Sequence, residues 1–336
     1  MAILNNEDRE LIVRNLDQLL SREADPDRRR SLWSDPVGRS TELWTSLSEM
    51  GIPGLFIGEP FGGSELSEVE MVTILEVFGR HGLHEAFVES YVAAGFIEDA
   101  MEDSIKTSWL PGIADGSKRI GLKLDSSKYV RDAHVVDGIL LQEGSNVHII
   151  ERENYDLLRM EAQDPAERLF LVTNHGNITD NYPWDGITKE RARLRLDIGI
   201  SALLIGVSEY LLNATVDYAI VREQFNRPIG SFQALKHLLA DAYARFWIAK
   251  QSVVKASKEL ALGTLDALYS IRAARIVATE ASSVVSDIAL QCHGGIGFTW
   301  EHNLHGYLKA QKSLEVAYGG IANLARENGA RMVRNR

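Results

Sequence analysis

The chain has 336 residues, a formal net charge of -11 at pH 7 and a single cysteine, Cys292. This length predicts two or three structural units, and the negative charge argues against a nucleic-acid surface, which needs clustered Lys and Arg. One cysteine excludes an internal disulfide and indicates a reducing, cytoplasmic compartment, while the longest apolar run, residues 200–207, is too short to span a bilayer.

Residues 1–116 are predicted to form an N-terminal helical domain. Apolar residues recur at helical spacing over residues 11–20 and 69–78. The stretch between them, residues 50–63, is rich in Gly and Pro and predicts turns. Ser67 and Glu70 form a capping box ahead of an apolar run, which predicts the start of a helix there.

Residues 117–186 are predicted to form a reduced middle β-domain, because short β-prone runs alternate with polar turns. These runs are residues 135–136, 138–141, 147–150 and 169–172. Residues 187–336 carry amphipathic patterns over residues 203–221, 232–258, 265–288 and from 321 onward. Helices of this length joined by short loops predict a C-terminal four-helix bundle. The expected fold is therefore mainly α with a small β unit.

Two segments of the bundle region carry residues suited to a phosphate-bearing ligand. Arg222 offers a planar fork of donors, Phe225 a ring that could lie near an adenine or ribose, and Gly294 with Gly295 a backbone that a ligand can approach closely. Each has a simpler alternative: an Arg at a helix end often pairs with a neighbouring carboxylate, a loop Phe is often core, and a Gly pair often only turns the chain. The glycines lack the strand-turn-helix context of a dinucleotide fingerprint, so we reject a Rossmann site.

Taken together, residues 218–233 (Tyr-Ala-Ile-Val-Arg-Glu-Gln-Phe-Asn-Arg-Pro-Ile-Gly-Ser-Phe-Gln) and residues 291–299 (Gln-Cys-His-Gly-Gly-Ile-Gly-Phe-Thr) resemble the paired flavin-binding signatures of the acyl-CoA dehydrogenase family. His237 and residues 239–241 follow in the family's pattern. The resemblance implies that each chain holds the ADP and pyrophosphate end of an FAD whose flavin ring lies in the neighbouring subunit. The implied cofactor-binding residues are Arg222, Gln224, Phe225, Gln291, Gly294 and Gly295.

The reaction implied by the resemblance is α,β-desaturation of an acyl-CoA thioester, in which a carboxylate removes the α-proton. Where the family carries Tyr-Glu-Gly-Thr, this chain reads Ala-Tyr-Gly-Gly, so the position of the catalytic Glu falls on Tyr318 or, with one insertion, on Gly319. In family members that carry the Glu on the first bundle helix, the count lands beside Asp197. Asp197 and Glu315 are therefore weak candidate bases, and Asp197 beside Arg193 and Arg195 is more simply a surface ion-pair member.

The middle domain also departs from the family. Residues 124–129 replace the family's Thr-Glu-Pro-x-Ala-Gly-Ser-Asp loop, and the β region is several strands short. The chain resembles the shorter, degenerate subunit of the heteromeric α2β2 acyl-CoA dehydrogenases with which bacteria degrade the side chains of sterols and bile acids. This implies a full-length acyl-CoA dehydrogenase partner, a bulky acyl group and electron-transfer flavoprotein as the electron acceptor.

Two further hypotheses stay open. The chain could be a self-sufficient homomeric acyl-CoA dehydrogenase that uses Asp197 or Glu315 as its base, or a non-enzymatic helical scaffold that has lost flavin. A metal site is not expected: His302 and His305 lie beside Glu301, but solvated histidines are the usual outcome after a glycine loop.

Overall fold

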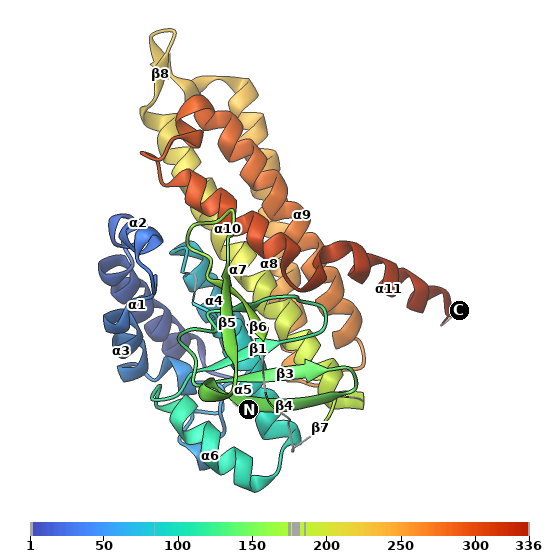
Figure 1. Cartoon of the computed structure of the whole chain (residues 1–336). Coiled ribbons are helices and arrows are strands. Elements are labelled where there is room, and N and C mark those ends of the chain that lie inside the picture. The colour runs from blue at the N-terminus through green and yellow to red at the C-terminus, as the bar shows by residue number, and fades with distance from the viewer. Residues whose placement is uncertain (1–2, 84, 174–175, 177–181, 185, 335–336) are drawn as a thin grey trace. The chain divides into compact units, whose positions relative to one another are not determined.

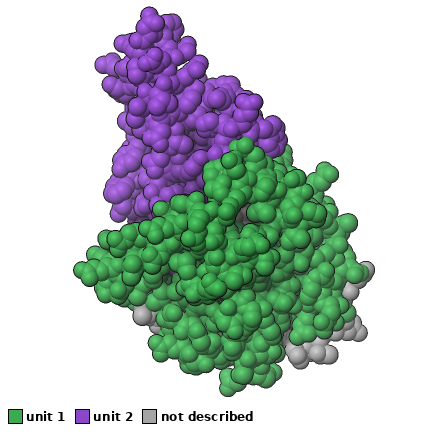
Figure 2. Space-filling view, turned by 90° about the vertical axis from the view of Figure 1, so that its left-hand side faces the viewer, with its two compact units in different colours: residues 1–71, 84–196 green, residues 72–83, 197–336 purple. Residues whose placement is uncertain are grey.

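The computed structural model describes residues 3–83, 85–173, 176, 182–184 and 186–334 (Figure 1). It confirms a mainly helical fold with a small β region between an N-terminal and a C-terminal helical part. By compactness the chain divides into unit 1, residues 1–71 with 84–196, and unit 2, residues 72–83 with 197–336 (Figure 2). The three-domain division expected from the sequence stays a prediction.

Several helices of the N-terminal part begin at side chains that satisfy free backbone N–H groups. Asn5 caps the first helix and Ser40 the third. The Ser67 hydroxyl accepts the N–H of Val69 at 3.2 Å and donates to the Glu70 carboxylate, and the helix begins at the next residue, so the predicted helix start is confirmed. The reciprocal capping box is not formed, because Glu70 accepts from the Ser67 hydroxyl and from the N–H of Leu4 rather than from the Ser67 N–H. These helices are α1 (Asn6–Glu23), α2 (Pro26–Ser34), α3 (Thr41–Glu49), α4 (Glu68–Arg80), α5 (Phe87–Ala100) and α6 (Asp103–Ala114).

The β region of unit 1 contains two small sheets. Its strands are β1 (Ile120–Lys123), β2 (Val130–Arg131), β3 (Gly138–Glu143), β4 (Asn146–Glu151), β5 (Asp156–Met160), β6 (Leu169–Thr173) and β7 (Tyr182–Pro183). One sheet has the order β1-β3-β4-β7, with β1 parallel to β3 and the other pairs antiparallel. The other is antiparallel, with the order β2-β6-β5.

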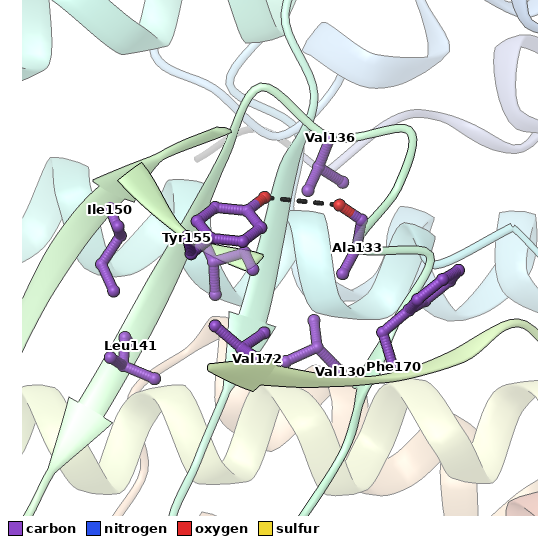
Figure 3. Packing of buried hydrophobic residues seen from close by; sticks show 9 residues of the cluster. Val130, Ala133, Val136, Leu141, Ile150, Tyr155, Phe170 and Val172 are labelled. Carbon is purple, nitrogen blue, oxygen red and sulfur yellow. Dashed lines mark hydrogen bonds between the residues drawn. The ribbon is translucent and has the colours of Figure 1, made fainter. Parts of the chain in front are cut away.

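A hydrophobic cluster packs within this β region (Figure 3). The Tyr155 hydroxyl donates to the carbonyl of Ala133 at 3.3 Å, so this buried polar group is satisfied. The expected β run at residues 135–136 is wrong, because Val135 donates its N–H to the carbonyl of Asp132 and the chain turns there. Val136 nevertheless belongs to the buried cluster.

Buried ion pairs also stabilise unit 1. Arg39 contacts Asp132 at 2.6 Å, and both side chains are buried. Arg195 is likewise buried and contacts Glu68 at 3.2 Å and Asp99 at 2.9 Å. Arg195 is therefore not a surface residue, because carboxylates from α4 and α5 bind its guanidinium.

Unit 2 holds the long helices of the bundle. They are α7 (Gly186–Val221), which begins in unit 1, α8 (Gln233–Ala261), α9 (Ala267–His293), α10 (Leu304–Val316) and α11 (Gly320–Arg334). The apolar periodicity predicted a helix that starts at residue 203, but α7 starts well before it. Helix α10 was not predicted as a separate helix. Among the described residues only α7 is long and apolar enough to cross a bilayer, but 78% of its most apolar 18-residue window is buried, as in a core helix.

Two glycines allow α4 and α7 to pack backbone to backbone in unit 2. A Cβ on Gly206 would lie 2.1 Å from the carbonyl oxygen of Glu76, and one on Gly79 would lie 2.2 Å from that of Leu203. Lys250 of α8 contacts Glu76 at 3.0 Å and Glu209 of α7 at 3.3 Å. The two helices are thus in backbone contact at their crossing, and Lys250 forms ion pairs with a carboxylate from each of them.

Candidate functional site

The first signature forms a hairpin directly after α7. Strands β8 (Glu223–Gln224) and β9 (Arg227–Pro228) pair antiparallel, and Phe225 and Asn226 at the turn have φ angles of 55° and 61°. Asn tolerates the left-handed conformation, but for Phe it costs about 1–3 kcal/mol. Its place in the turn leaves Phe225 88% exposed.

Arg222 lies between the end of α7 and the hairpin. Its N–H donates to the carbonyl of Tyr218 at 2.8 Å, and its own carbonyl accepts from Ile229 at 2.8 Å, so its backbone is held on both sides. Its side chain is exposed and makes no ion pair within the described part of the chain. The simpler alternative of a pairing with a neighbouring carboxylate is therefore wrong, and the guanidinium remains available to an external anion.

Residues 223–228 of this signature are also exposed. The Gln224 side chain donates to the carbonyl of Glu223 at 2.7 Å. The rings of Phe225 and Phe232 meet edge to face with 6.1 Å between centroids, and the guanidinium of Arg227 lies 4.0 Å from the centre of the Phe232 ring. Phe225 is not a core residue in this chain.

The second signature ends α9 and continues into a 3-10 turn, residues 294–298. Gly294 has φ 62° and ψ -139°, a conformation essentially restricted to glycine. No atom lies within 4 Å of a Cβ built on Gly294 or Gly295, so this backbone faces open space. Gln291 is exposed in the last turn of the helix, whereas Cys292 is half-buried and burial raises the pKa of its thiol, which favours an inert side chain.

The two signatures lie at the same end of unit 2 (Figure 1). The ring of Tyr218, one turn before Arg222, stacks on the ring of His293, with 4.4 Å between centroids and 19° between planes. This end therefore presents an unpaired guanidinium, an open glycine backbone and an exposed aromatic ring. These groups fit the diphosphate and nucleoside end of FAD, although the assignment of each residue stays a prediction.

The position expected for a catalytic carboxylate is a tight turn between α10 and α11. Tyr318, Gly319 and Gly320 have φ angles of 54°, 98° and 62°. Neither residue aligned with the family's Glu carries a carboxylate, and a tyrosine with an ordinary pKa of about 10 is a poor base near neutral pH.

The two alternative carboxylates, Asp197 and Glu315, both interact electrostatically with one buried cation, Arg275 of α9. Burial lowers the pKa of Arg275 to about 10, although Asp197 and Glu315 both favour its charged form. Its guanidinium donates to the carbonyl of Leu314 at 2.8 Å, at the end of α10. The sequence pattern did not single out Arg275, because an isolated arginine in an amphipathic helix reads as a surface residue.

Glu315 also accepts hydrogen bonds from Gln311 and Lys312, both at 2.9 Å. Burial alone would raise the pKa of Glu315, but these donors and Arg275 outweigh it and leave its pKa below the ordinary value. A general base for α-proton removal needs a free carboxylate of matched pKa. The structure thus weakens the case for Glu315 as catalytic base, while the role of Asp197 stays a prediction.

The histidines after the glycine loop are not solvated, contrary to expectation. His305 is 6% exposed and its ring meets Trp300 edge on, while His302 is half-buried against His293. Over the described ranges, no group of three or more His, Cys, Asp or Glu is placed to hold a metal ion. The histidines instead form an aromatic cluster.

Comparison with known proteins places both helical parts in one family. Residues 6–117 match the acyl-CoA dehydrogenase N-terminal domain, and residues 190–333 match the acyl-CoA dehydrogenase C-terminal domain. The acyl-CoA dehydrogenase IpdE2 of Mycolicibacterium smegmatis is 31% identical over 305 residues, covering 90% of this chain and 92% of that protein. IpdE2 of Mycobacterium tuberculosis is 29% identical over 304 residues, covering 90% of each chain.

Solved structures share the same fold. The chain matches a Tcur3481-Tcur3483 steroid ACAD variant with a TM-score of 0.87 and 21% identity, covering 98% of both chains. It matches the ChsE4-ChsE5 complex from Mycobacterium tuberculosis with a TM-score of 0.86 and 22% identity, covering 99% of both chains.

Proposed function

Because the chain belongs to the acyl-CoA dehydrogenase family and is related to IpdE2, we propose that it is one subunit of a heteromeric FAD-dependent acyl-CoA dehydrogenase. In this proposal the chain supplies binding residues to an FAD carried by a full-length partner subunit, in an α2β2 assembly. The partner supplies the catalytic carboxylate.

The observation that carries the proposal is an asymmetry within unit 2. At one end of unit 2, Arg222 makes no ion pair among the described residues and the backbone at Gly294 and Gly295 is uncovered. The turn at Tyr318 has no carboxylate. The alternative carboxylates, Asp197 and Glu315, both stabilise the charge of Arg275. A self-sufficient homomeric enzyme would need a free base, and a scaffold that has lost flavin would have no need of an open diphosphate site.

In the proposed reaction the acyl-CoA thioester loses one proton from the α-carbon and one hydride from the β-carbon, and a double bond forms between them. FAD, when bound, supplies the hydride acceptor. Arg222 would neutralise diphosphate charge, and the backbone N–H of Gly295 would donate to a phosphate oxygen. Gly294, whose own N–H donates to the carbonyl of Leu290, would let the phosphate approach closely, and Phe225 would cover the adenosine. Gln224 and Gln291 offer amide donors beside them.

Exposed apolar side chains on α8 support association with another chain. Tyr243, Trp247 and Ile248 are 56%, 49% and 60% exposed. Contiguous exposed apolar side chains of this size are typical of interaction surfaces.

Relatives whose names include steroid ACADs favour a bulky, ring-bearing acyl group. Electron-transfer flavoprotein is the proposed electron acceptor, and the single cysteine fits a cytoplasmic complex.

The test is to purify the chain alone and together with a candidate full-length acyl-CoA dehydrogenase, and to measure mass and flavin absorbance. The expected result is FAD only in the mixed complex, at one FAD per pair of unlike chains. Arg222→Ala should weaken FAD binding by roughly ten- to a hundredfold, because a charge-assisted hydrogen bond contributes about 1.5–3 kcal/mol. Arg14→Ala, on an exposed face of α1, is the matched control.

Stoichiometric FAD in the lone chain would support the homomeric alternative and make Asp197 and Glu315 the next residues to substitute. No FAD with any partner would support the scaffold. Full FAD occupancy in the Arg222→Ala complex would refute the role given to Arg222.

A further inference from the structure

An aromatic cluster joins the two signatures of unit 2, and its role rests on the proposed function. Tyr218 belongs to α7 and lies one turn before Arg222, to which it is tied by the Arg222 N–H bond to its carbonyl. His293 is the last residue of α9 and directly precedes Gly294. The Tyr218 and His293 rings stack with 4.4 Å between centroids.

The His293 ring is fixed from two other directions. Its Nδ1 lies 2.8 Å from the carbonyl oxygen of Ala289, so Nδ1 carries the proton and donates along the helix. The His302 ring meets it at 61° with 4.9 Å between centroids. His302 Nδ1 accepts the N–H of Leu304 at 3.1 Å, which ties this part of the cluster to the start of α10.

These contacts set the relative position of two otherwise exposed segments. The hairpin from Arg222 to Pro228 is exposed, and so are Gln291 and the backbone at Gly294 and Gly295. The stack is the direct side-chain link between them among the described contacts. A ligand group bridging a guanidinium and a glycine backbone requires that the two be held in register.

We propose that the Tyr218–His293 stack is a positioning device that holds the Arg222 guanidinium in register with the Gly294-Gly295 backbone, so that both bind the same diphosphate. Tyr218 and His293 are positioning residues, since neither needs to touch the ligand. Offset ring stacking is directional, so replacing one ring with an aliphatic side chain of similar size removes the register while leaving a hydrophobic contact.

The experiment uses the mixed complex, stripped of flavin and titrated with FAD while flavin fluorescence is recorded. Tyr218→Leu should raise the Kd for FAD about five- to tenfold, the range of a lost aromatic stacking preference. Tyr218→Phe keeps the ring and should bind FAD within about twofold of the unsubstituted complex. Recovery by the aromatic variant separates ring stacking from a role of the Tyr218 hydroxyl.

The matched control is Tyr210→Leu. Tyr210 of α7 stacks on Tyr307 of α10 with 3.5 Å between centroids, and it is half-buried like Tyr218. Tyr210→Leu should lower the thermal unfolding midpoint measured without FAD but leave the Kd for FAD unchanged. The flavin-free midpoint of every variant is recorded in parallel.

An unchanged Kd in Tyr218→Leu would overturn the positioning role, as would an equal loss of FAD affinity in Tyr210→Leu. An unsubstituted complex that binds no FAD would instead overturn the proposed function. The two failures are thus distinguished by whether the unsubstituted complex is yellow.

Discussion

Gly206→Ala tests the close crossing of α4 and α7 within unit 2. The added methyl carbon would lie 2.1 Å from the carbonyl oxygen of Glu76, 2.6 Å from the backbone nitrogen of Arg80 and 2.8 Å from the Cα of Gly79. All three atoms belong to the backbone, so no side-chain rotation can relieve the overlap. The two helices must separate, which would also pull on the contacts of Lys250 with Glu76 and Glu209.

The magnitude follows from two opposing terms. Forcing a methyl group into a packed interface costs up to about 3 kcal/mol. Replacing Gly by Ala within a helix returns about 1 kcal/mol of intrinsic propensity. We therefore expect Gly206→Ala to lower the free energy of unfolding by about 2 kcal/mol.

Gly329→Ala is the control, because it makes the same change within α11, where no atom lies within 4 Å of the added carbon. It should be neutral or raise stability by up to about 1 kcal/mol. Urea unfolding followed by circular dichroism compares both variants with the unsubstituted chain. A Gly206→Ala chain as stable as Gly329→Ala would refute the backbone-to-backbone packing.

Three further predictions concern charge, acid stability and assembly. Arg39→Met should destabilise unit 1 by about 3–5 kcal/mol in urea unfolding, since it leaves the buried Asp132 carboxylate without its cation; the reasoning fails if the loss is below about 1 kcal/mol. Burial lowers the pKa of His293, so below its ordinary value of about 6.5 the unfolded chain binds a proton that the folded chain excludes. Stability should therefore fall as the pH decreases from 7.5 to 5.5, and less steeply in His293→Phe; equal slopes would contradict this. Trp247→Asp should prevent stable assembly with the partner, as measured by native mass, and an intact complex would argue against the α8 surface.

Local sequence signals predicted several parts of the fold. The Ser67 hydroxyl caps its helix within a single turn, so the local sequence is enough to specify this helix start. The early part of α7 escaped prediction, because its charged residues look like a solvated segment. In the structure, Arg195 is buried against Glu68 and Asp99, carboxylates from distant parts of the chain. Because these carboxylates neutralise Arg195, this charged part of α7 can be buried, and no local pattern could have predicted that.

The sequence by itself determined the residue types of the candidate site: the guanidinium, the exposed-turn aromatic, the glycine pair and the absence of a carboxylate at Tyr318. These depend on identity and spacing along the chain. Only the tertiary structure decided that the Tyr218 ring stacks on the His293 ring and that Asp197 and Glu315 stabilise the charge of Arg275. The reason is physical: ring stacking and burial of a charge act over a few ångströms in space, and helix packing brings together residues that no local pattern connects.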